Sequence, residues 1–184
     1  LAPLRVARST WPDEVQKWPH LSHLRVSVIT GTPKQRERAL AKEADIYCTN
    51  YDNLVWLRKE LGDAWPFKTV VADEFTRLKS YRIRQGGSRA RALGQVAHTH
   101  VTRFIGLTGT PAPNGARDLE NVFAFVWPGQ GRAAVASALE DDNLRTASGL
   151  LRPLFVRTTK EALQLPPVDL RLCPITLPPL HRDL

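Results

Sequence analysis

Short apolar runs alternate along most of the chain with stretches in which apolar residues recur at helical spacing. The apolar runs predict strands at residues 24–30, 45–50, 67–73 and 102–109. The stretches between and after them predict helices at residues 33–44, 51–61, 86–100, 116–127 and 133–151. Short, almost continuously apolar strands that alternate with helices are typical of a parallel sheet covered on both faces. The pattern therefore predicts an α/β domain.

Length and composition are those of a globular protein with one domain. The 184 residues, 42% of them hydrophobic, are enough for one domain with a core and a short extension. No apolar run approaches the length of a membrane span, so we expect no membrane association. The two cysteines, Cys48 and Cys173, have no metal-ligand spacing and fit a reducing, cytoplasmic setting. The chain begins with Leu1 and contains no methionine, so we expect its N-terminus to be a cut edge.

An acidic pair ends the third predicted strand. In the stretch VVADEFTRLK, residues 70–79, Asp73 and Glu74 directly follow the apolar run. Ligands of open α/β sheets bind beyond the carboxyl ends of the strands. There, one carboxylate can hold a Mg²⁺ ion between nucleotide phosphates, often through water, and a second can deprotonate an attacking water. Two acids after an apolar run are also common by chance, so the pair alone favours a strand end with two solvated acids.

A hydroxyl-rich loop ends the fourth predicted strand. The stretch GLTGTPAPN, residues 106–114, contains Thr108, Gly109 and Thr110. The two hydroxyls can bond a carboxylate or a phosphate, and glycine permits a close backbone approach. A loop that only ends a strand is the alternative. If the third and fourth strands are neighbours, this loop and the acidic pair open onto the same edge of the sheet.

The chain is basic. Lys and Arg outnumber Asp and Glu by 26 to 18, which gives a net charge of +8 and favours a polyanionic partner, nucleic acid first. The segment YRIRQGGSRARALG, residues 81–94, concentrates four arginines around a Gly-Gly pair: Arg82, Arg84, Arg89 and Arg91. This segment is either a loop that contacts a phosphate backbone or a solvated charged surface, and the sequence leaves both open.

Five segments together resemble a known family. They have the order and spacing found in the Swi/Snf-type ATPases, a branch of the superfamily-two helicases, and the small bacterial or phage members are the most similar. The segments are LAPLRVARSTWPDEVQKW (1–18), CTNYDNL (48–54), VVADEFTRLKS (70–80), GLTGTPAPN (106–114) and LLRPLFVRTTKEALQLPPV (150–168). The resemblance implies a three-layer RecA-like fold with a mostly parallel sheet, ATP and Mg²⁺ as cofactors, and duplex DNA as partner.

The resemblance also implies roles for individual residues. Asp73 would hold Mg²⁺ through water, and Glu74 would be the catalytic base. Nucleotide binding, and its coupling to movement, would involve Asp73 and the loop residues Thr108, Gly109 and Thr110. Nucleic acid would be contacted by Pro3, Leu4, Arg5, Thr49, Asn50, Arg77, Lys79, Arg82 and Arg84.

The chain departs from the family pattern in two ways. Phe75 and Thr76 follow the acidic pair where the family often has Ala-His, and no phosphate-binding loop of the form G-x-x-x-x-G-K-[ST] occurs. By the resemblance, that loop and the first strand would precede residue 1, and a second RecA-like lobe would follow residue 184. We therefore expect a partial ATP-binding lobe at residues 1–164 and, at residues 165–184, a linker toward that second lobe.

Three functions are weighed. The first is part of an ATP-dependent translocase that moves on duplex DNA in a bacterial or phage-infected cell; we expect this chain alone to be unable to turn over ATP. The second is a non-catalytic module that binds nucleic acid or protein and derives from a helicase lobe. The third, a metal-dependent nuclease using Asp73 and Glu74, lacks the further acidic and lysine residues that such a site needs.

Overall fold

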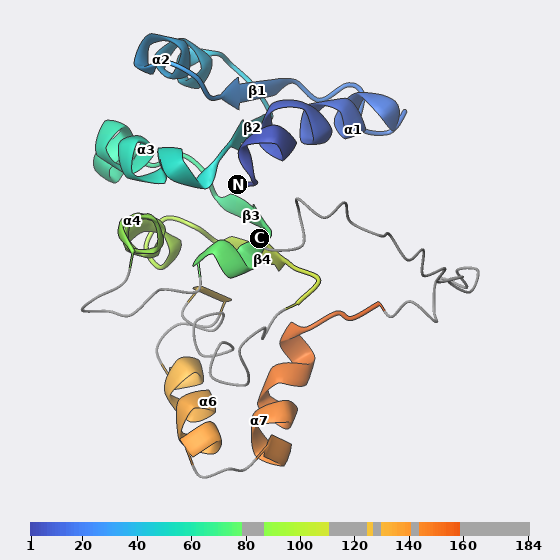
Figure 1. Ribbon diagram of the computed structural model, residues 1–184, viewed down its shortest axis with the longest axis vertical. Helices are drawn as coiled ribbons and strands as arrows, with labels where there is room; N and C mark the ends of the chain where they lie inside the picture. The colour runs from blue at the N-terminus through green and yellow to red at the C-terminus, as the bar shows by residue number, and fades with distance from the viewer. Residues whose placement is uncertain (79–86, 111–124, 127–129, 141–143, 159–184) are drawn as a thin grey trace, which may run out of the picture. The chain divides into compact units, whose positions relative to one another are not determined.

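The computed structural model describes residues 1–78, 87–110, 125–126, 130–140 and 144–158 (Figure 1). The chain forms two compact units, Leu1–Leu154 and Phe155–Leu184, and residues 155–158 are the described part of the second. The expected boundary between residues 164 and 165 falls outside the described residues and stays a prediction. All the helices and strands given below belong to the first unit.

Four short parallel strands occupy the four predicted runs. They are β1 (Val26–Ile29), β2 (Ile46–Thr49), β3 (Thr69–Asp73) and β4 (Arg103–Leu107). Strand β1 pairs with β2, and β3 pairs with β4, both in parallel. The prediction of a parallel sheet is therefore confirmed, with each strand slightly shorter than its apolar run.

The N-terminal residues join the two strand pairs. The Leu1 ammonium donates to the Val71 carbonyl at 2.6 Å, and the Leu1 carbonyl accepts from the Asp73 amide at 2.7 Å. On the other side, the Ala2 amide donates to the Thr49 carbonyl at 3.1 Å. Residues 1–2 thus hold a strand position between β2 and β3, where Figure 1 marks the N-terminus. The spatial order is β1, β2, residues 1–2, β3, β4, all parallel.

The helices lie close to the predicted positions, with two differences. They are α1 (Trp11–Lys17), preceded by a π-helical turn (Val6–Thr10), α2 (Pro33–Ala41), α3 (Leu54–Leu61), α4 (Ser88–Ala97), α6 (Gln130–Glu140) and α7 (Leu144–Leu151). Short 3₁₀ turns cover Tyr51–Asn53, Gly62–Ala64, Phe75–Leu78 and Arg152–Leu154. None of the described helices is long and apolar enough to cross a membrane.

Two of the helix predictions need correction or completion. The single helix expected at 133–151 is wrong: α6 and α7 are two helices that pack against each other, separated by residues 141–143. The N-terminal helix was not predicted, because the pattern of apolar residues before Trp18 is short and irregular. Of the helix expected at 116–127, only residues 125–126 are described, and they are helical.

The elements form three layers. Figure 1 shows α2, α3 and α4 on one side of the strands and α1 on the other. On the α1 side, Ala2, Ala7 and Cys48 form a small buried cluster, and burial raises the pKa of the Cys48 thiol. The opposite side holds the larger core, to which α3 contributes Leu54 and α4 contributes Leu93. The predicted three-layer α/β fold is confirmed.

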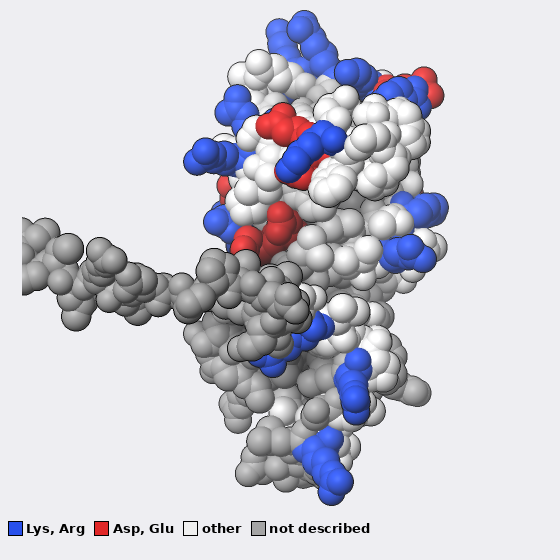
Figure 2. All heavy atoms as spheres, turned by 90° about the vertical axis from the view of Figure 1, so that its right-hand side faces the viewer, with Lys and Arg blue, Asp and Glu red and all other residues white. Residues whose placement is uncertain are grey.

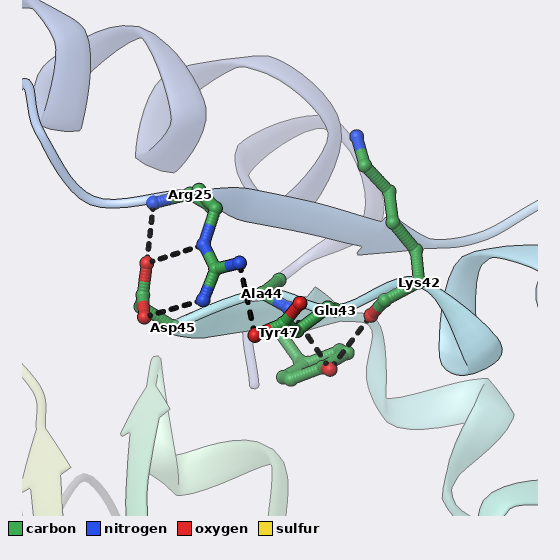
Figure 3. A network of polar contacts seen from close by, with 6 residues as sticks. All are labelled: Arg25, Lys42, Glu43, Ala44, Asp45 and Tyr47. Carbon is green, nitrogen blue, oxygen red and sulfur yellow. Dashed lines mark hydrogen bonds and ion pairs between the residues drawn. The ribbon is translucent and has the colours of Figure 1, made fainter.

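An ion-pair network fixes the start of β1 to the start of β2 (Figure 3). The Arg25 guanidinium contacts Asp45, with Nε at 3.1 Å from Oδ2, and Glu43, with Nη1 at 3.1 Å from Oε1. Arg25 lowers the pKa of Asp45 from 3.8 to about 2, chiefly through side-chain hydrogen bonds. The groups are exposed, so the network contributes little to the stability of the fold.

Candidate functional site

The carboxyl ends of β3 and β4 lie side by side. In the parallel register Asp73 of β3 is opposite Leu107 of β4. Because the chain leaves both strands at the same edge, the acidic pair and the loop that begins at Thr108 project from neighbouring positions. The expectation that the two strands are neighbours is confirmed, and the candidate site is assembled at this edge.

Both the side chain and the backbone of Asp73 are hydrogen-bonded. Its carboxylate accepts from the Trp11 indole, with Nε1 at 3.1 Å from Oδ2, and from the Glu74 amide at 3.0 Å from Oδ1. Its carbonyl accepts from the Tyr51 hydroxyl at 2.5 Å, and its amide donates to the Leu1 carbonyl at 2.7 Å. Trp11 of α1 and the Glu74 amide thus orient the carboxylate, while Tyr51 and Leu1 hold the backbone of Asp73.

The Tyr51 hydroxyl stabilises the carboxyl end of β3. Its side chain is buried, and burial raises the pKa of the phenol above its usual range, with the negative charge of Asp73 adding to the effect. The hydroxyl therefore stays protonated at all physiological pH values and remains a donor to the Asp73 carbonyl. Neither Trp11 nor Tyr51 was predicted to contact Asp73, because both lie far from it in sequence.

Glu74 is exposed and has an unusual backbone conformation. Its φ of 53° is the one positive value found outside glycine among the described residues. A left-handed conformation is unfavourable for a residue with a Cβ atom and often marks a functional position. The turn continues with the Arg77 amide donating to the Glu74 carbonyl at 2.9 Å. This backbone conformation leaves the Glu74 carboxylate in solvent beside Asp73.

Phe75 anchors the turn in the core. Its ring is 3% exposed and lies edge-on to Phe104 and Phe125, with centroids 5.5 Å and 5.7 Å away. A Cβ atom on Gly106 would come within 3.0 Å of the Phe75 ring, so the glycine in β4 makes room for it. In the sequence Phe75 stands out only because it departs from the family pattern. In the structure its buried ring anchors the turn that carries Glu74.

The loop after β4 begins with a side-chain turn. The Thr108 hydroxyl accepts from the Thr110 amide at 3.1 Å. Among the described residues a Cβ atom on Gly109 would meet no atom within 4 Å, so none of these residues requires a glycine there. The expectation that Thr108, Gly109 and Thr110 bind nucleotide stays a prediction.

The Asp73 carboxylate fits a Mg²⁺ ion whose other ligands are mainly waters and substrate phosphates. Each carboxylate oxygen accepts one hydrogen bond, which leaves lone pairs free for a metal or its waters. Within the described ranges no three His, Cys, Asp or Glu side chains group as a metal site. Mg²⁺ commonly binds through one or two carboxylates together with waters and substrate phosphates, so the donor set fits it.

The predicted nucleic-acid residues differ in exposure. Pro3 is half-buried, and its carbonyl accepts from the Ala7 amide at 2.9 Å. Leu4 and Arg5 are exposed at the start of the N-terminal helical segment, and Arg77 is exposed in the acidic turn. The other predicted basic residues, Lys79, Arg82 and Arg84, lie outside the described residues.

Thr49 and Asn50 have structural contacts. Their side chains are 4% and 7% exposed. The Thr49 hydroxyl donates to the Ile29 carbonyl at 2.7 Å, and the Asn50 amide group donates to Asp52 at 3.3 Å. In this structure both side chains hold the end of β2 in place, and nucleic-acid contact by them stays a prediction.

The positive charge of the described residues is dispersed on the face drawn in Figure 2. Figure 2 shows Lys and Arg in separate groups on the face that it draws, with acidic side chains between them. Arg89, one of the four clustered arginines, forms an ion pair with Asp52, with Nη2 at 2.5 Å from Oδ1. This arginine is therefore used, at least in part, to fix α4 to the turn before α3.

Comparison with known proteins identifies the family. The profile of the SNF2-related domain matches residues 1–183, and the chain belongs to this family. The predicted resemblance to Swi/Snf-type ATPases is thereby confirmed.

Three relatives show the range of similarity. Putative protein p41 of Acyrthosiphon pisum secondary endosymbiont phage 1 is 55% identical over 131 residues, which cover 71% of this chain and 28% of that protein. Switch 2 of Arabidopsis thaliana is 26% identical over 175 residues, 82% of this chain and 19% of that protein. Chromatin remodeling factor mit1 of Schizosaccharomyces pombe is 23% identical over 196 residues, 96% of this chain and 13% of that protein. The chain spans less than a third of the length of each.

Proposed function

We propose that this chain forms the acidic half of an ATP-hydrolysis site in a Swi/Snf-type translocase that moves on duplex DNA. The observation that carries the proposal is the parallel register of β3 and β4, which brings the acidic pair and residues 108–110 to one edge of the sheet. Membership in the SNF2-related domain family supports the same assignment.

The two acids have different environments, which fit two different roles. Asp73 is oriented by Trp11 and by the Glu74 amide, as expected of a carboxylate that holds a metal-bound water in a fixed place. A Mg²⁺ ion bound there would neutralise charge on the nucleotide phosphates. Glu74 is exposed and free to accept a proton from the water that attacks the γ-phosphate. Thr108, which follows β4 at the same edge of the sheet, offers a hydroxyl that can bond a phosphate or a carboxylate.

Duplex DNA is the proposed track. The net charge of +8 and the exposed Arg5 and Arg77 support contacts with a phosphate backbone. The name of one relative, chromatin remodeling factor mit1, also supports a DNA-bearing substrate. A second RecA-like lobe would complete the site, and the similarity to a phage protein supports action in the cytoplasm of a bacterial or phage-infected cell.

ATP hydrolysis by the full-length gene product, with and without duplex DNA, tests the proposal. We expect Mg²⁺-dependent hydrolysis that duplex DNA stimulates, and no turnover by the 184-residue chain alone, since its sequence has no phosphate-loop motif. Salt-sensitive DNA binding by the full-length protein without any hydrolysis would contradict the proposal and favour the non-catalytic module.

A further inference from the structure

The helical segment that carries Trp11 contains one rare turn. Residues 4–17 are continuously helical, and within them Val6–Thr10 form a π-helical turn that leads directly into α1. The Trp11 amide donates to the Val6 carbonyl, five residues back, as in a π-helix. Single π-helical turns inside α-helices are rare and frequently lie at functional sites. This one ends at the residue whose indole contacts Asp73, so the turn helps to set the direction of that side chain.

The segment is packed firmly on the sheet. The π-helical turn contacts β2, and α1 contacts β1. The Trp11 ring packs against the small buried cluster of Ala2, Ala7 and Cys48. Because packing and a hydrogen bond both hold the ring, a shift of the segment over the sheet would move the indole, and the Asp73 carboxylate with it.

The outer side of the same segment is basic. Arg5 and Arg8 lie three positions apart, and both are exposed. Neither guanidinium has an ion-pair partner among the described residues. Arg8 was not among the predicted nucleic-acid residues, and it gives the segment a second cation beside Arg5. Contacts of this kind to a phosphate backbone fix the position and orientation of a protein on DNA.

The indole is suited to orient a carboxylate without competing for its metal. Its N–H is a donor only, so it can bond Asp73 but cannot itself bind a cation. The indole Nε1 is 3.1 Å from the Asp73 Oδ2. Groups that hydrogen-bond a metal-binding carboxylate typically contribute about 10–100-fold to metal affinity or activity.

We propose that Trp11 is a positioning residue that transmits DNA binding to Asp73. Duplex DNA on Arg5 and Arg8 fixes the helical segment, and the indole passes this position on to the carboxylate. The inference rests on the proposed function and adds to it the route by which DNA regulates the site. By linkage, DNA then tightens the binding of Mg²⁺-ATP, and Mg²⁺-ATP tightens the binding of DNA by the same factor.

Hydrolysis by the full-length gene product, titrated with Mg²⁺, tests the role of the indole N–H. Benzothienylalanine, incorporated at position 11 alone, keeps the shape of the ring and replaces the N–H by sulfur. We expect it, like Trp11→Phe, to raise the Mg²⁺ concentration for half-maximal hydrolysis by about 10-fold or more. Duplex DNA should lower this concentration by about 5-fold or more in the wild type, and most of this effect should be absent from both Trp11 forms.

Trp18 provides the matched control. Its exposed indole donates to the Glu14 carboxylate at 2.9 Å, so the same kind of bond occurs near the end of the same helical segment, away from Asp73. Trp18→Phe should change neither the Mg²⁺ requirement nor the response to DNA.

The indole N–H resonances of ¹⁵N-tryptophan-labelled full-length protein test the DNA route without nucleotide or turnover. The Trp11 resonance is assigned by its absence from the Trp11→Phe spectrum, and it should shift when duplex DNA is added. Trp65, whose buried indole donates to the Phe67 carbonyl at 3.1 Å, should not respond. Replacing both Arg5 and Arg8 by glutamine should abolish the shift of Trp11.

The possible failures are distinguishable. An unchanged Mg²⁺ requirement in the benzothienylalanine form, or a Trp11 resonance that does not move when DNA binds, would overturn the role of Trp11 and leave the proposed function standing. A wild type that binds no duplex DNA or hydrolyses no ATP would refute the proposed function, and this inference with it.

Discussion

Replacing Glu74 by glycine should make the fold more stable while it removes the proposed catalytic base. Glu74 has a φ of 53° and an exposed side chain, so the substitution removes backbone strain without removing packing. A residue with a Cβ atom loses about 1–2 kcal/mol in the left-handed conformation. Glycine gains about 0.5–1 kcal/mol of freedom in the unfolded chain, which leaves a net stabilisation of about 0.5–1 kcal/mol.

Urea and thermal unfolding of the 184-residue chain measure this difference. In a chain of this size 1 kcal/mol shifts Tm by about 2–4 °C, so Glu74→Gly should raise Tm by roughly 1–4 °C. Glu74→Val should act in the opposite direction, because a β-branched residue tolerates positive φ least. We expect the two variants to differ by about 2 kcal/mol or more.

Gly62 provides a control for the effect of a Cβ atom at positive φ. Its φ of 50° and ψ of −133° lie in a region that almost only glycine adopts, and a Cβ atom there would meet no atom nearer than 4.0 Å. Gly62→Ala should therefore lose about 1–3 kcal/mol through conformation alone. If Glu74→Val were as stable as the wild type while Gly62→Ala lost stability, the left-handed conformation of Glu74 would be refuted.

Three further predictions concern the groups around the site and the strand starts. Trp11→Phe and Asp73→Ala each remove the hydrogen bond between the indole and the carboxylate. In a double-mutant cycle measured by urea unfolding, their coupling energy should be about 1–2 kcal/mol. A coupling energy of zero would argue against that contact. Phe75→Ala should lose about 3–5 kcal/mol and Phe75→Leu less than about 1.5 kcal/mol, and a loss below about 1 kcal/mol for alanine would show that the ring is no anchor. The pKa of Asp45 is lowered from 3.8 to about 2, so the stability that its ionised form contributes is present above pH 4 and is lost as pH falls through 2. The urea midpoint of the wild type should exceed that of Asp45→Asn at pH 5, and the difference should shrink as pH falls toward and below 2. A constant difference would contradict the assigned ion pair.

The strands were predictable because each is a local apolar run. The end of β3 at Asp73 was predicted from where the apolar residues stop, whereas β4 ends at Leu107, two residues before the predicted end at 109. Neither apolar run indicates which strand it pairs with. The sequence supported the pairing of β3 with β4 only through the βαβ order and the family resemblance. With the pairing in place, the common edge for Asp73 and Thr108 followed from parallel geometry alone.

The details of the site depend on contacts between distant residues. Trp11 and Tyr51 reach Asp73 from 62 and 22 positions away, and no local pattern marks either as its partner. The left-handed conformation of Glu74 stands next to Phe75, which is buried among residues distant in sequence, and no local pattern indicates it. A single helix was predicted over 133–151, whereas the structure has α6 and α7 on either side of residues 141–143.

The division of roles between Asp73 and Glu74 is the central claim, and single-turnover hydrolysis tests it most directly. In the full-length gene product with duplex DNA and Mg²⁺, Glu74→Gln should bind ATP as the wild type does. It should hydrolyse ATP about 10²–10⁴-fold more slowly, the contribution typical of a general base. Glu60→Gln, on an exposed position of α3, is the control and should react at the wild-type rate. Hydrolysis by Glu74→Gln at the wild-type rate would contradict the account.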